Sequence, residues 1–232
     1  MEISVVIPAI NEAEGIAAAV DSASSQGAME VLVVDGGSQD DTVRRAQAAG
    51  ARVVTSPSGR ARQQNAGAAL ASGQVLLFLH ADNRLGPHCL EQIREAFERR
   101  PQAWGGAFRH RIDAPQWLFR CIEWGDAMRV RWRGLPFGDQ GLFIRREAFE
   151  QVGGFPDEPL MEDLLLARRM RRTAWPLLLP GPVWSSPRRW QRHGVVRQTV
   201  RNWSLQVAHA CGCSPDRLAA YYRRHDGPAE RP

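Results

Sequence analysis

The chain has 232 residues, of which 44% are hydrophobic and 24% are charged. This balance excludes wholesale disorder and a fibrous repeat, and the length suits one compact domain with at most a short extension. A net charge of +5, carried by arginine, favours an anionic partner such as a phosphate or a lipid surface, unless it only reflects an arginine-rich genome. No nucleic-acid-binding motif accompanies the charge, so we expect no nucleic-acid partner.

The cysteines, at positions 89, 121, 211 and 213, lack the C-x-x-C spacing that would close a zinc site. A strand is expected from Ile3, which leaves no room for a leader, and no segment reaches the ~18 consecutive apolar residues of a membrane span. We therefore expect a cytoplasmic protein. Its basic segments leave peripheral contact with the inner membrane face open.

The first hundred residues alternate apolar strands with amphipathic helices, the pattern of a mostly parallel sheet flanked by helices. Strands are predicted over 3–7, 31–34, 52–55 and 75–82, followed by helices over 12–25, 40–49, 61–71 and from Pro87. The alternation then stops. Later elements are predicted as strands over 104–110, 141–145 and 176–179, and as helices over 162–172 and 195–210.

Polar residues follow three of the predicted strands. Residues 8–12 read Pro-Ala-Ile-Asn-Glu, residues 35–38 read Asp-Gly-Gly-Ser, and residues 80–82 read His-Ala-Asp. The carboxyl ends of parallel strands form ligand sites, so a shared site is expected here. The glycine pattern of a dinucleotide site is missing after the first strand, which argues against an NAD-binding Rossmann site.

Several of these polar residues have a second interpretation. Asn11 could cap the following helix, and Asp40 and Asp41 are better explained as the start of a helix than as ligands. Asp35 is better explained as a residue that binds a ligand, because a carboxylate can accept a hydrogen bond from a base N–H or a ribose hydroxyl. Arg60 and Arg62 open a helix where cations suit phosphate, although exposure explains Arg62 equally well.

The second half has two further polar pairs. Glu162 and Asp163 begin a helix that ends in arginines, an arrangement that the helix dipole alone would favour by ~0.3–1 kcal/mol per charge. Asp139 and Gln140 precede a strand, where a plain turn is the alternative. Aromatic and basic residues over 117–133, and the basic helix over 195–210, could pack internally, cover an acceptor pocket, lie on an anionic membrane or form a homodimer.

In order and spacing, these segments resemble a family 2 glycosyltransferase of the GT-A fold. The resemblance rests on Val5–Glu12, Val31–Ser38, His80–Asp82, Gly138–Gly141 and Met161–Asp163. The compact length and the segments Phe78–Asp82 and Gly138–Gly141 are most similar to a small bacterial branch labelled arsenosugar-biosynthesis or radical-SAM-associated glycosyltransferases. The resemblance implies an α/β GT-A fold with a mostly parallel central sheet and a C-terminal helical extension.

The resemblance also implies domain limits. The catalytic domain would cover 1–190, with a nucleotide-binding half over 1–100 and an acceptor half over 101–190. A helical extension would cover 191–224, and a disordered tail 225–232. The segment Ser186–Trp190 is similar to the Gln-x-x-Arg-Trp box of processive members, but it lacks the glutamine, so polymer synthesis is not expected.

Roles for individual residues follow from the resemblance. The nucleotide and donor set is Pro8, Ala9, Asn11, Glu12, Asp35, Gly36, Arg60, Asn65 and Ala81. Asp82 would bind Mn²⁺ or Mg²⁺, His80 stands where the family has its first carboxylate, and Asp163 would be the general base. The acceptor side would carry Asp139, Gln140, Glu162, Arg189 and Trp190.

The implied function is metal-dependent, inverting transfer of a sugar from a nucleotide-diphosphate sugar, with UDP as the expected nucleotide, to a small-molecule or lipid-linked acceptor. A sugar nucleotidyltransferase is the first alternative, but it would need a glycine-rich, basic loop after the first strand. A non-catalytic nucleotide-sugar-binding protein is the second alternative. It stays open because His80 replaces a carboxylate.

Overall fold

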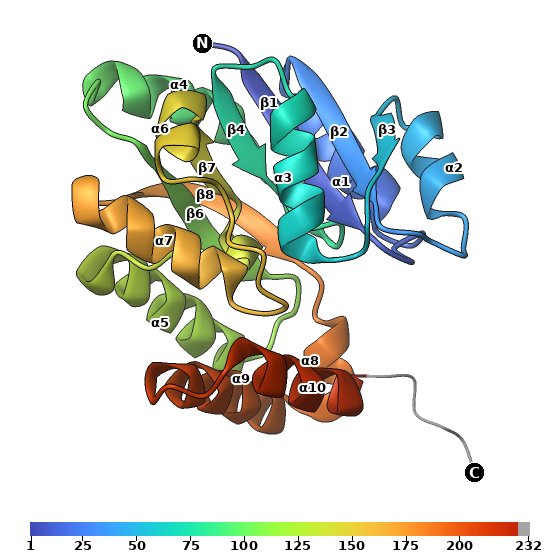
Figure 1. The fold of residues 1–232 in the computed structure, drawn as a ribbon, viewed down its shortest axis with the longest axis vertical. Helices are drawn as coiled ribbons and strands as arrows, with labels where there is room; N and C mark the ends of the chain where they lie inside the picture. Colours follow the sequence, from blue (N-terminus) through green and yellow to red (C-terminus); the bar gives the residue numbers. More distant parts are fainter. Residues whose placement is uncertain (227–232) are drawn as a thin grey trace.

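A single eight-stranded sheet, with helices on both faces, forms the centre of the molecule (Figure 1). The computed structural model describes the backbone of residues 1–226 and their side chains except at 189, 192, 193, 206, 210 and 222–226. The strand order is β3-β2-β1-β4-β7-β6-β8-β5. The chain therefore starts near the middle of the sheet and builds outward in both directions.

The first half alternates strands and helices as predicted. Its elements are β1 (Ile3–Ala9), α1 (Ile16–Ser24), β2 (Glu30–Asp35), α2 (Thr42–Ala48), β3 (Arg52–Thr55), α3 (Arg60–Leu70), β4 (Val75–Phe78), β5 (Asn83–Leu85) and α4 (Cys89–Arg99). Strand β1 pairs in parallel with β2 and β4, and β2 with β3. All four residues of β4 are buried, as a continuous apolar strand covered on both faces should be.

The second half makes the sheet mixed. Its elements are β6 (Gly105–Ile112), α5 (Trp117–Arg133), the 3₁₀ turn η1 (Gly138–Gln140), β7 (Leu142–Arg145), α6 (Arg146–Gln151), α7 (Glu162–Thr173), β8 (Leu177–Ser185), α8 (Arg188–His193), α9 (Val195–Ala210) and α10 (Pro215–Asp226). Strand β7 runs antiparallel to β4 and β6, whereas β6 and β8 are parallel. The α/β prediction of a mostly parallel sheet is confirmed.

The core has one layer on each face of the sheet. Successive side chains of a strand point to opposite faces, so Val5 joins the cluster that includes residues of α1 and α4, whereas Val6 joins the cluster beneath α3, α6 and α7. Gly67 lets α3 approach the sheet closely, because a Cβ there would lie 2.4 Å from Val6 Cγ1. Both layers hold the strand ends in fixed positions.

Several boundaries differ from the sequence predictions. Helix α1 begins at Ile16, not at residue 12, and Asn11 has a left-handed φ of 53°, so the capping role considered for Asn11 is wrong. Asp40 does serve the start of α2, because its carboxylate accepts a hydrogen bond from the Thr42 N–H (2.9 Å). Helix α10 continues to Asp226, through the beginning of the predicted tail, and residues 227–232 lie outside the described part.

No helix within residues 1–226 combines the length and apolar character needed to cross a lipid bilayer. Short elements such as β5, α6 and α8 were not predicted. Each of them has too few residues for a periodic pattern of hydrophobic positions to be recognised in the sequence.

Candidate active site

Two adjoining pockets open at the carboxyl ends of β1 and β4. They share four lining residues, which are Arg60, His80, Asp82 and Leu160. The first, called here the β1-side pocket, is also lined by Pro8, Ala9, Ile10, Glu12, Ser58, Gly59, Gln63, Ala81, Pro159 and Glu162. The second, the α9-side pocket, is also lined by Asn83, Phe137, Asp139, Met161, Asp163, Ser185, Ser186, Trp190, Gln198, Asn202 and Leu205.

The β1-side pocket is built from strand ends and the start of α3. Gln63, which is buried, donates from Nε2 to the carbonyl oxygens of Ala9 (3.0 Å) and Val34 (2.8 Å). This amide holds the ends of β1 and β2 against α3. The free backbone N–H groups at the start of α3 suit an anion, and Arg60 adds a cation there.

Three of the predicted nucleotide residues, Asn11 after β1 and Asp35 and Gly36 at the end of β2, lie beside this pocket but are not in its lining. The carboxylate of Asp35 accepts hydrogen bonds from the N–H groups of Gly37 (3.0 Å) and Ser38 (3.1 Å). Asn11 Oδ1 accepts from the Gln39 N–H (2.8 Å). At Gly36 a Cβ would lie 2.6 Å from Ile10 Cδ1, so the segment after β2 packs closely on the end of β1. These contacts fix that segment at the same edge of the sheet.

Two predicted site residues have structural roles instead. Asn65 donates to the Phe155 carbonyl oxygen (2.8 Å) and accepts from the Phe155 N–H (3.0 Å). Gln140 is fully buried, and its Oε1 accepts from Arg129 (2.8 Å) while its Nε2 donates to the Phe108 carbonyl oxygen (3.3 Å). A side-chain amide can serve a donor and an acceptor at once, and here both are used within the protein. Neither residue is in the lining of either pocket, and their predicted ligand contacts stay predictions.

Glu162, which was predicted for the acceptor side, lines the β1-side pocket. Only 2% of it is exposed. Arg60 Nη1 lies 3.3 Å from Glu162 Oε1. Burial raises the pKa of Glu162, the Arg60 charge opposes that rise, and the neighbouring Asp163 adds to it. The pair thus links the start of α7 to the start of α3.

Asp82 and His80 stand on the boundary between the two pockets. Both residues line both pockets, on the segment that joins β4 to β5. A Cβ on Gly138 would lie 2.6 Å from His80 Nε2, so η1 is in close contact with the histidine. The carboxylate of Asp82 and the imidazole of His80, on this shared boundary, are suitable ligands for a divalent cation. Phosphate oxygens of a bound ligand would complete the coordination of that cation.

Arg188, which follows β8, contacts two acidic residues that follow β1. It forms ion pairs with Glu12 (3.0 Å) and Glu14 (3.0 Å), and the charge of Asp82 helps to raise the pKa of its guanidinium against the opposing effect of burial. The side chain of Arg189 lies outside the described part. Arg188 therefore connects the segment after β8 to the end of β1.

Besides Asp82, two carboxylates line the α9-side pocket, and they differ in their hydrogen bonding. Asp163 accepts hydrogen bonds from the N–H groups of Gly138 (2.7 Å) and Leu164 (2.7 Å), so both of its oxygens are oriented. Asp139 Oδ1 is buried and has no hydrogen-bond partner among the described residues. Burial raises the pKa of Asp139. Trp190 lines the same pocket and meets Phe119 edge to face, with ring centroids 5.8 Å apart.

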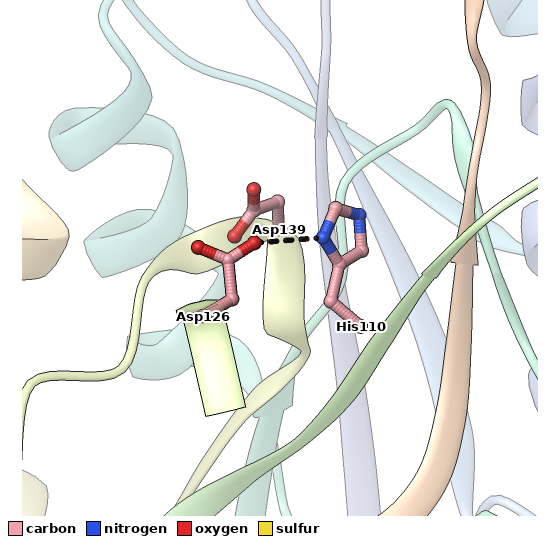
Figure 2. Close-up of side chains that lie close together, drawn as sticks. All are labelled: His110, Asp126 and Asp139. Atoms are coloured by element: carbon pink, nitrogen blue, oxygen red, sulfur yellow. Dashed lines mark hydrogen bonds and ion pairs between the residues drawn. The ribbon is translucent and has the colours of Figure 1, made fainter. Parts of the chain in front are cut away.

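Behind Asp139 lies a polar cluster that the sequence analysis missed (Figure 2). Potential ligand atoms of His110, Asp126 and Asp139 lie within 4.8 Å of one another. His110 Nδ1 is 3.2 Å from Asp126 Oδ2, and its Nε2 is 2.6 Å from Ser185 Oγ. Arg129 also pairs with Asp126 (2.7 Å). His110 and Arg129 both contact Asp126, whereas Asp139 Oδ1 has no hydrogen-bond partner among the described residues, and the spacing of the cluster would admit a cation.

The surrounding carboxylates favour the charged form of His110. Burial alone lowers the pKa of this imidazole, but the carboxylates of Asp139, Asp126 and Glu123 outweigh burial, and the pKa is raised. A sequence signal existed, because His110 takes a buried position in the alternation of β6 between Phe108 and Ile112. A lone histidine in a strand does not show which carboxylates it meets.

The sequence profile described as Glycosyl transferase family 2 matches residues 4–153. The chain belongs to this family. A glucosyl-3-phosphoglycerate synthase of Mycobacterium tuberculosis is 38% identical over 100 residues, which are 38% of this chain and 31% of that protein. An uncharacterized glycosyltransferase of Nostoc is 34% identical over 107 residues, which are 42% of this chain and 33% of that protein. The match spans about a third of the length of these curated relatives.

Solved structures are similar over more of the chain. S. aureus TarS in complex with UDP-GlcNAc superposes with a TM-score of 0.65 at 17% identity, covering 80% of this chain and 58% of that chain. The M. tuberculosis glucosyl-3-phosphoglycerate synthase with Mg²⁺ and UDP gives a TM-score of 0.58 at 21% identity, covering 80% and 69%. The similarity confirms the predicted GT-A fold.

Proposed function

We propose that the protein is a metal-dependent, inverting glycosyltransferase that moves a sugar from a UDP-sugar to a small-molecule or lipid-linked hydroxyl acceptor. The observation that carries this proposal is the pair of pockets with Asp82 on their shared boundary and Asp163 on the far side. A donor in one pocket and an acceptor in the other would meet beside Asp82. Family membership favours a transferase over a nucleotidyltransferase.

The β1-side pocket is assigned to the donor. Pro8, Ala9 and Ala81 would form its backbone walls, and Arg60 with the start of α3 would face the diphosphate. Asn11, after β1, and Asp35 and Gly36, at the end of β2, are proposed to face the base and ribose. A relative, the M. tuberculosis synthase, has been crystallised with Mn²⁺ and UDP-glucose. The similarity of fold supports the same class of donor here.

Asp82 would hold Mn²⁺ or Mg²⁺, with His80 as a second candidate ligand. When bound, such a cation offsets the negative charge of the diphosphate leaving group. Arg60 lines both pockets and would add a fixed positive charge near the same phosphates. Leu160, also shared by the pockets, narrows the boundary with an apolar side chain. Water would be displaced there when both substrates are bound.

Asp163 is proposed as the general base. Its two oxygens accept two backbone hydrogen bonds, and a carboxylate has about four lone-pair positions, so further ones remain for an acceptor hydroxyl. The hydroxyl proton would pass to Asp163 as the hydroxyl oxygen bonds to the anomeric carbon. The bond from that carbon to the diphosphate breaks, and its electron pair leaves with UDP. One displacement from the opposite side inverts the anomeric configuration.

Asp139 and Trp190 are proposed to bind the acceptor. Asp139 contributes a carboxylate to the lining of the α9-side pocket, and the Trp190 ring offers a flat apolar surface in the same pocket. Helix α9 also contributes to this pocket through Gln198, Asn202 and Leu205. The proposed helical extension after residue 190 therefore completes the acceptor pocket. Placement in the arsenosugar-biosynthesis branch remains a prediction that rests on residues 78–82 and 138–141.

Calorimetric titration with UDP, in the presence and absence of Mn²⁺, tests the proposal. Mn²⁺ should strengthen UDP binding to the wild type, and Asp82→Ala should remove that dependence because it removes the carboxylate on the pocket boundary. Asp157→Ala is the matched control, since Asp157 is an exposed carboxylate that pairs with Arg62 outside both linings. If UDP and GDP both fail to bind the wild type in either condition, the transferase proposal is wrong.

A further inference from the structure

The outer face of α9 carries an uncovered apolar stripe. Val196, Val200, Trp203 and Val207 are 65%, 58%, 61% and 62% exposed. Their spacing of four, three and four residues places them on one side of a helix. Among residues 1–226 no segment covers this stripe, because each of the four side chains is mostly exposed. Core packing therefore does not explain why these positions are apolar.

The opposite side of α9 already packs against the protein. Gln198 and Leu205 are 2% and 5% exposed, and together with Asn202 they line the α9-side pocket. Helix α9 lies at the edge of the molecule, beside α8 and α10 and away from the sheet (Figure 1). The helix thus has one face directed to the pocket and a second apolar face directed outward.

The segment that carries the stripe has charges of one sign, although Arg188 at its start is paired with Glu12 and Glu14. Residues 188–210 contain five arginines and two histidines, and no aspartate or glutamate. Arg197, on the flank of the stripe, is exposed. A helix with an apolar face that includes a tryptophan and with basic flanks is typical of segments that lie in the interface of an anionic lipid bilayer. Trp203 stands at the centre of the stripe, where an interfacial indole would lie.

We propose that the outer face of α9 binds the surface of an anionic phospholipid bilayer. A second copy of the chain fits this face less well, because a two-fold contact would bring the basic segment of each copy against that of the other. Anionic headgroups complement the arginines while the acyl boundary takes up the valines and the tryptophan. The bilayer would then lie next to the helix that forms one wall of the α9-side pocket. This proposal does not depend on the transfer reaction.

Vesicle flotation tests the proposal. The full chain is mixed with phosphatidylcholine vesicles made with or without phosphatidylglycerol, at low and high salt. Binding should require phosphatidylglycerol and weaken with salt, since headgroup attraction is screened. Replacing Val200→Ser and Trp203→Ser together should weaken partitioning by about tenfold or more, because apolar side chains that enter the bilayer are lost. Arg197→Glu should weaken it by about fivefold or more.

Matched variants control for composition and charge. Leu70→Ser with Trp175→Ser changes two exposed apolar residues elsewhere, which are 44% and 52% exposed, and Arg172→Glu makes the same charge change on α7. These variants should float like the wild type, and unchanged thermal unfolding of the α9 variants verifies folding. The proposal is wrong if the wild type does not bind anionic vesicles, or if the α9 variants and the control variants bind them equally well. Concentration-dependent dimers that the α9 variant disperses, without vesicle binding, would instead identify a self-interface.

Discussion

The two pockets differ in how the chain builds them. The β1-side pocket comes mainly from three neighbouring features of the first hundred residues: the end of β1, the start of α3 and the segment after β4. The α9-side pocket gathers side chains from the segment after β4, from η1, α7, β8, α8 and α9. A pocket made at the ends of adjacent parallel strands follows from the strand pattern itself. A pocket assembled from distant segments depends on tertiary packing.

The β1-side pocket is proposed to bind the donor, whereas the α9-side pocket holds Asp163, the proposed general base. Asp163→Asn should lower turnover by about 10²–10⁴-fold, the range for loss of a general base, and should leave UDP affinity unchanged. Release of UDP from UDP-glucose, with water as a slow acceptor, measures the turnover. Asp157→Asn serves as the exposed control. Equal turnover of Asp163→Asn and wild type would mean that another group removes the proton.

The sequence predicted the first pocket better for a physical reason. The buried apolar run from Val75 leads to Asp82, and the carboxylate of Asp82 lies on the boundary of the two pockets. The hydrophobic pattern and the order of the strands were sufficient to predict this position. A motif position could not show that Arg129, eleven residues before Gln140, would hold its side chain. It also could not show that Glu162 and Asp163, successive residues at a helix start, would line different pockets.

Asn65 tests whether a residue predicted to bind the donor stabilises the fold instead. Its amide serves the backbone of Phe155, so Asn65→Ala should lower the free energy of unfolding by about 1–3 kcal/mol, the cost of unpaired buried polar groups. UDP affinity should not change. Denaturant unfolding and UDP titration measure the two effects separately. A loss of UDP affinity at unchanged stability would restore Asn65 to the donor site.

The smallest expected effect concerns pH. The pKa of His110 is raised in the folded protein, so the stability that its charge provides is fully present below its unfolded pKa, about 6.5, and is lost as pH rises through the folded value. His110→Asn should therefore be least stable relative to the wild type near pH 6, with the difference shrinking toward alkaline pH. Thermal unfolding of both proteins between about pH 6 and pH 9 measures this. A difference that grows with pH would mean that His110 is buried neutral.

Hydrogen exchange of the full chain with Mn²⁺ and UDP tests the central assignment most directly, because it maps the nucleotide onto one of the two pockets. The account predicts slower exchange in peptides that cover residues 8–12, 59–63 and 80–82, around the β1-side pocket, and little change over 198–205 on α9. Protection confined to residues 198–205, or no protection in either pocket, would contradict it.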